Sequence, residues 1–86
     1  MKTKKLFYEA IVADNLEKFM KVLFSDLSPD DKMEIYLLEN GSNRLIDVYI
    51  KNRCFGRRAQ TVLKKSGKKN LIDLFDSLWG FCADEY

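Results

Sequence analysis

Apolar residues recur along this chain at steps of three and four, which is the period of an amphipathic helix. Residues 3–13 have Leu6, Phe7, Ala10 and Ile11 at such positions, and the next segment has Leu16, Phe19, Met20, Leu23 and Leu27. Between these segments, Asp14-Asn15 predicts a turn, because both residue types compete for backbone hydrogen bonds and favour caps. A single helix running to about Phe24 is the alternative.

The clearest helix start is the sequence SPDD at residues 28–31. Serine can cap free amide groups, proline suits the first helical position, and two carboxylates favour the positive end of the helix dipole. The predicted helix carries Met33, Tyr36 and Leu37 on one face. It ends at Asn40-Gly41, where glycine can adopt the left-handed conformation that terminates helices.

Residues 42–53 fit either a helix or a strand. Their β-branched and aromatic residues have high strand propensity, but Leu45, Val48 and Tyr49 follow the i, i+3, i+4 spacing of a helix. An isolated strand would lack a partner elsewhere in the chain. The sequence therefore favours a helix, with Ser42 or Asn43 as its cap.

Two further helices are predicted after Gly56. The first is short and basic, with apolar positions at Ala59, Val62 and Leu63, and it ends at residues 66–67. The second is expected to be capped by Asn70. Its predicted inner face consists of Leu71, Leu74, Phe75 and Leu78. Gly80 marks the expected stop.

One five-residue motif occurs twice in similar form. It is LIDVY at residues 45–49 and LIDLF at residues 71–75, 26 residues later. Such a recurrence indicates that similar helical units stack on one another. We therefore predict an all-α fold, a small single domain over residues 1–86, with four to six short helices packed as antiparallel helical hairpins.

This pattern resembles that of ankyrin-type helical repeats. The segments KLFYEA at 5–10, DNLE at 14–17 and VL at 22–23 look like the family's first helix, tight turn and second helix, and residues 41–67 look similar again. The threonine-proline-leucine-histidine signature is absent, the leading leucines are spaced unevenly, and residues 28–39 add an extra helix. The resemblance implies a module that presents a protein-binding surface.

Charge is strongly segregated although the net charge is only +2. Residues 41–69 contain nine basic side chains and a single acidic one, Asp47, whereas residues 6–40 and 70–86 are both acidic overall. The nine basic residues form the basic block: Arg44, Lys51, Arg53, Arg57, Arg58, Lys64, Lys65, Lys68 and Lys69. A block of this kind can contact an acidic protein, bind nucleic acid, or be a solvated face.

We expect an acidic protein surface as the partner, with Trp79 and Phe81 as possible apolar anchors beside the basic block. For Trp79 the favoured alternative is core packing of the final helix. Nucleic acid is the alternative, including a helix-turn-helix whose Arg57–Lys65 helix enters a major groove. Acidic segments within about one or two Debye lengths weaken the field that a polyanion would experience. From the small size and the charge segregation we expect a small adaptor or an inhibitor of the phage-encoded or immunity type. Its oligomeric state stays open.

The residue types present argue against catalysis. The chain has no histidine, the commonest general base and metal ligand, so we expect no enzyme activity, no metal and no cofactor. Cys54 and Cys82 are expected to be small buried hydrophobes, although basic neighbours of Cys54 could activate a thiol. Two cysteines without a leader segment favour a cytoplasmic protein, and no apolar run is long enough for a membrane helix.

Overall fold

The computed structural model describes residues 2–25 and 28–81, which fold into six helices and contain no strand. The helices are α1 (Lys2–Ala13), α2 (Leu16–Leu23), α3 (Asp31–Asn40), α4 (Asn43–Asn52), α5 (Arg57–Lys65) and α6 (Lys69–Leu78). They pack against one another over a common apolar core. The predicted all-α fold is confirmed, and the 42–53 segment is a helix.

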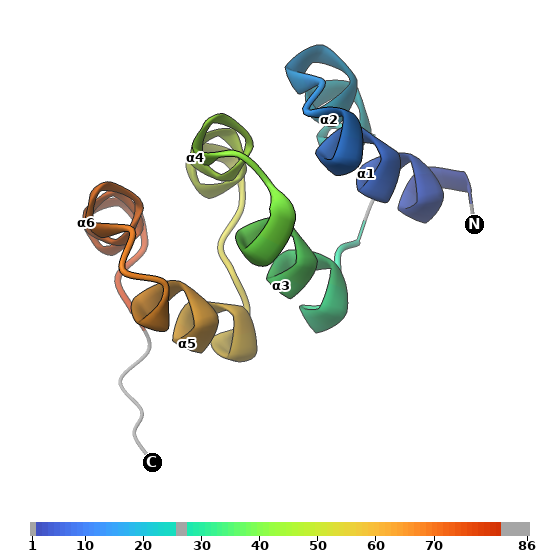
Figure 1. Cartoon of the computed structure of the whole chain (residues 1–86). Helices are drawn as coiled ribbons and strands as arrows, with labels where there is room; N and C mark the ends of the chain where they lie inside the picture. The colour runs from blue at the N-terminus through green and yellow to red at the C-terminus, as the bar shows by residue number, and fades with distance from the viewer. Residues whose placement is uncertain (1, 26–27, 82–86) are drawn as a thin grey trace.

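The helices lie in two rows (Figure 1). In one row α3 packs between α1 and α5, and in the other α4 packs between α2 and α6. Each odd-numbered helix is followed by its even-numbered partner, so the fold is a stack of three helix pairs. The predicted extra helix at residues 28–39 is α3, and it occupies the middle of its row. It is therefore an integral part of the stack.

The five-residue motif repeated at 45–49 and 71–75 has a structural basis. Leu45 and Leu71 are each the third residue of their helix, and Tyr49 and Phe75 follow one turn later. All four side chains are buried. The two segments thus have equivalent positions in successive second-row helices, and similar side chains pack there because similar neighbours surround them.

Aromatic rings run through the core from one end of the stack to the other. The ring of Phe7 packs on that of Phe19 at 5.5 Å between centroids, and Phe55 stacks on Tyr49 at 4.8 Å and approaches Phe75 at 5.7 Å. Because these rings come from both rows and from the α4–α5 connection, they join the rows into one core.

Three predicted core positions, Leu6, Met20 and Leu78, are exposed instead, and Met20 of α2 is 37% exposed. Leu6 lies about 160° around α1 from Tyr8, whose ring meets Tyr36 of α3, so Leu6 faces away from the row. Leu78 lies in the last turn of α6, at the opposite end of the stack, and is 51% exposed. The periodicity of each helix is correct, but terminal helices lack a neighbour on one side.

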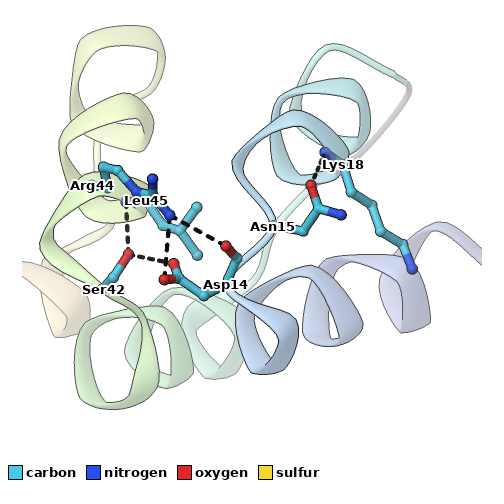
Figure 2. A network of polar contacts seen from close by, with 6 residues as sticks. All are labelled: Asp14, Asn15, Lys18, Ser42, Arg44 and Leu45. Carbon is cyan, nitrogen blue, oxygen red and sulfur yellow. Dashed lines mark hydrogen bonds and ion pairs between the residues drawn. The ribbon is translucent and has the colours of Figure 1, made fainter.

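The turn between α1 and α2 is fixed by contacts with the next helix pair (Figure 2). Asp14 has a positive φ of 53°, and its carboxylate accepts a hydrogen bond from the Ser42 hydroxyl at 2.7 Å. Arg44 pairs with the same carboxylate at 3.3 Å, and Asn15 caps α2 by accepting from the Lys18 backbone N–H at 3.0 Å. The predicted turn is confirmed, and the single long helix does not form.

The caps of α3 differ from those predicted. Asp30, not Ser28, is the N-cap, since its carboxylate accepts the backbone N–H of Met33 at 2.9 Å. This hydrogen bond lowers the pKa of Asp30. Gly41 ends α3 with φ −80°, which is not left-handed. Glycine is needed there for space, because a Cβ would lie 2.7 Å from the carbonyl oxygen of Leu37.

The start of α6 is also different from the prediction. The helix begins at Lys69 after Lys68 in the N-cap position, so Asn70 lies inside the helix and does not cap it. The preceding turn uses Gly67 at φ 77°, a conformation that favours glycine, and the backbone N–H of Lys68 donates to the Ser66 hydroxyl at 3.2 Å. The turn geometry therefore sets where α6 begins.

None of the helices in the described part of the chain combines the length and the apolar character needed to cross a membrane.

Candidate functional site

The fold divides the basic block between the two rows of helices. Arg57, Arg58, Lys64 and Lys65 belong to α5, in the first row, whereas Arg44, Lys51 and Lys69 belong to α4 and α6, in the second. Arg53 and Lys68 lie in the connections before α5 and α6. The block is therefore distributed over three helices and two connections.

The four cations of α5 share one side of that helix. At about 100° per residue, Lys64, Arg57, Thr61, Lys65 and Arg58 fall within an arc of roughly 120°. All five are exposed, whereas Ala59, Gln60 and Leu63 on the opposite side are buried. We call Arg57, Arg58, Lys64 and Lys65 the basic face of α5. It is the densest positive surface formed by the predicted binding residues.

Two predicted binding cations are held by backbone carbonyls. The guanidinium of Arg53 donates to the carbonyl of Leu23 at 3.3 Å, and the ammonium of Lys68 donates to the carbonyl of Leu38 at 3.3 Å. Both carbonyls lie near the C-terminal ends of helices, where backbone acceptors lack intrahelical partners. Arg53 and Lys68 are half-buried and join neighbouring helix pairs.

Three exposed cations of the block have acidic partners. Arg44 pairs with Asp14, Lys51 pairs with Asp47 at 3.0 Å within α4, and Arg58 approaches Asp31 at 3.8 Å. Such exposed pairs contribute about 0–1 kcal/mol each and are screened by salt. The other exposed cations of the block take part in no ion pair within the described residues: Arg57, Lys64, Lys65 and Lys69. Lys64 lies over the ring of Phe81, so the charges of Arg57, Lys65 and Lys69 are the least compensated.

A buried carboxylate supports the N-terminal end of α5. Glu34 of α3 accepts hydrogen bonds from the hydroxyl of Tyr49 and from the backbone N–H of Gly56, the latter at 2.9 Å. Burial raises the pKa of Glu34, against the opposing effect of these two hydrogen bonds, and burial also raises the pKa of Tyr49. The network ties α3, α4 and the start of α5 together, so the basic face has a rigid base.

The predicted aromatic anchors have different environments. Trp79 is 47% exposed, yet its indole N–H donates to the carbonyl of Ile50 at 2.7 Å. Phe81 is half-buried against Phe75, and the ammonium of Lys64 lies 5.0 Å from its ring centroid. Trp79 therefore combines a fixed orientation with an exposed ring, whereas Phe81 packs beside the basic face.

Sequence reasoning missed one exposed aromatic residue. Phe24 directly follows α2 and is 63% exposed. It continues the run of apolar residues at the end of α2, and nothing in the local sequence distinguishes it from them. The signal that identifies it is structural: Phe24, Arg53 and Trp79 are each the first residue after a second-row helix.

Two shallow grooves lie between neighbouring helices of the same row. One, of about 440 Å³, lies between α4 and α6 and is lined by Asn43, Arg44, Asp47, Val48, Asn70 and Leu71. The other, of about 420 Å³, lies between α3 and α5, with Leu38 and Val62 beside Glu39 and Lys65. The second groove borders the basic face of α5.

A metal site requires several ligand side chains close together. The described residues contain no group of three acidic or cysteine side chains that could hold a metal ion. Cys54 is exposed, so the prediction that it is a buried hydrophobe was wrong. It lies in the connection after α4, where the neighbouring Phe55 occupies the core position instead. Cys82 lies outside the described residues.

No family model, curated protein or solved structure matches this chain in the three comparisons that were made. The ankyrin-type resemblance thus stays a prediction from the sequence.

Proposed function

We propose that this protein is a non-catalytic protein–protein interaction module that binds an acidic surface of its partner through the basic face of α5. The observation that supports this most is the alignment of Arg57, Arg58, Lys64 and Lys65 on one side of a helix that contains no acidic residue. Complementary charge across an interface steers association and fixes orientation. A small adaptor or an inhibitor of the phage-encoded or immunity type would use such a face.

The surroundings of the basic face favour a protein over a nucleic acid. Asp31 and Glu39 of α3 border it, and α6 carries Asp73 and Asp76, so the positive surface is too short to follow a long phosphate backbone. Gln60, which a DNA-reading α5 would need to expose, is buried and donates to the carbonyl of Phe55 at 2.7 Å. An acidic protein patch requires only a compact positive surface.

The test is a charge reversal that leaves the packing intact. Arg57→Glu with Lys65→Glu changes two exposed cations that pair with no described residue. Lys65 is preferred to Arg58, because a carboxylate at position 58 would face Asp31. The probe is an oligo-glutamate peptide, with binding followed by titration calorimetry. We expect the double variant to bind at least about tenfold more weakly than the wild type.

The matched control is Lys5→Glu with Lys32→Glu, which makes the same charge change on exposed residues of α1 and α3. We expect this control to lose much less affinity. Equal losses in both variants would show that only net charge matters, and the proposed surface would be wrong. Tighter binding of a duplex oligonucleotide than of the peptide, with a steep salt dependence, would instead support a nucleic-acid partner.

A further inference from the structure

The second-row helices end in a line of three side chains that the basic face of α5 does not include. Phe24, Arg53 and Trp79 occupy the same position, the first residue after α2, α4 and α6 respectively. Since α4 packs against both α2 and α6, these ends are neighbours. We call these three residues the C-terminal edge.

Two of the three side chains are held in place by the neighbouring helix. The guanidinium of Arg53 donates to the last carbonyl of α2, from Leu23, and the indole of Trp79 donates to the carbonyl of Ile50 in the last turn of α4. Both bonds satisfy acceptors that a helix end leaves open. A partner would therefore meet side chains that have already lost their rotamer freedom, which lowers the entropic cost of binding.

The edge presents exposed apolar surface on either side of a cation. Phe24 is 63% exposed and Trp79 is 47% exposed, with Leu78 exposed beside Trp79. Aromatic residues and arginine are the types enriched in the energetic centres of protein interfaces. Because Phe24 and Trp79 are exposed at equivalent helix ends, these two aromatic side chains require an explanation other than core packing.

The charge at the edge favours an acidic occupant. Within the described residues Arg53 takes part in no ion pair, and a guanidinium has five N–H donors, of which the bond to Leu23 uses one. Lys21 and Lys51 are exposed in the last turns of α2 and α4, whereas the last turn of α6 contributes Asp76. The remaining donors of Arg53 can therefore bind a carboxylate between the two aromatic side chains.

From these observations we propose that the C-terminal edge binds a segment of another protein in which an acidic side chain lies between two apolar ones. Neighbouring helix axes are about 8–10 Å apart, and an extended chain advances about 3.3 Å per residue. The three contact residues of an extended partner are thus spaced about three positions apart. This inference goes beyond the proposed function, because it concerns a different surface.

The experiment is selection of a random peptide display library on the wild-type protein, followed by titration of the selected peptides in solution. Trp79 is the single tryptophan of the chain, so its fluorescence reports directly on this edge. We expect selected peptides with an Asp or Glu between apolar residues, and a saturable change in Trp79 emission. Replacing that acid by its amide should weaken binding at least about tenfold.

Phe24→Ser tests the edge without touching the core, and Val12→Ser is its control, since Val12 is 74% exposed on α1. We expect Phe24→Ser to weaken binding at least about tenfold and Val12→Ser to leave it unchanged. Equal effects of the two variants would overturn the proposal, as would selected peptides that lack an acid or a library that yields no binders.

A shift in Trp79 emission that depends on protein concentration alone would identify a second copy of the chain as the occupant instead. Arg57→Glu with Lys65→Glu should leave peptide binding to the edge largely intact, which separates this test from that of the basic face.

Discussion

Glu34 is the residue whose environment departs most from what its type predicts. A glutamate at the fourth residue of a helix suits the helix dipole, and nothing in the local sequence indicates that it is buried. In the fold it lies between Tyr49 and Gly56, and it connects three successive segments of the chain. Because of the tertiary packing, this residue near the start of α3 makes buried polar contacts.

The raised pKa of Glu34 gives a pH dependence with a definite sign. Between the ordinary value of 4.5 and the raised folded-state pKa, the folded protein binds more protons than the unfolded chain. The free energy of unfolding should therefore fall as pH rises from about 4.5 through the folded-state pKa. Glu34→Gln should remove this slope, as measured by urea unfolding at a series of pH values.

The control for this prediction is Glu39→Gln, which changes an exposed carboxylate on the same helix. It should keep the wild-type slope. An identical pH dependence in Glu34→Gln and the wild type would mean that Glu34 does not cause it.

At the scale of single elements, hydrophobic spacing predicted the helices well and their ends less well. The period of three and four indicated helices in all six segments, because amphipathic spacing can be read directly from the sequence. It left residues 42–53 open between helix and strand, and it did not exclude a single helix up to Phe24. Caps were harder, since several residues in each turn can accept a backbone N–H. At α4 the sequence left Ser42 and Asn43 as alternatives, and the structure selects Ser42, whose hydroxyl accepts from Leu45 and donates to Asp14.

Ser42→Ala should therefore reduce the free energy of unfolding by about 1–2 kcal/mol, because it removes both a cap and a contact between helix pairs. Asn43→Ala changes the other candidate, an exposed residue in the first turn, and should have little effect. Chemical denaturation of both variants measures the difference. A larger loss from Asn43→Ala would mean that the cap is assigned to the wrong residue.

At the scale of the whole molecule, stability should be highest in the middle of the stack. α3 and α4 each have a neighbour on both sides within their rows, whereas α1, α2, α5 and α6 have one. Native-state hydrogen exchange should therefore be slowest at amides of α4, such as those of Tyr49 and Ile50. Slowest exchange in α1 or α2 would contradict this order.

Which residues are available at the candidate sites also depends on the tertiary structure. The sequence identified the basic block and named Trp79, because charge and residue type can be counted along a chain. It could not show that Arg53 and Lys68 bind carbonyls of other helices, or that Arg44 pairs with Asp14, since those contacts join residues about 30 positions apart. Phe24 was missed because its exposure depends on how α2 packs, which the spacing of residues within α2 does not show.

By itself, the sequence determined that this chain forms short amphipathic helices, that similar units recur, and that positive charge is concentrated in residues 41–69. Those properties follow from local spacing and composition. Only the tertiary structure decided which faces are covered: it placed α3 at the centre of a row, divided the basic block between two rows, and aligned Phe24, Arg53 and Trp79 along one edge. The reason is that burial and proximity depend on how helices pack, and the period of a single helix does not specify its neighbours.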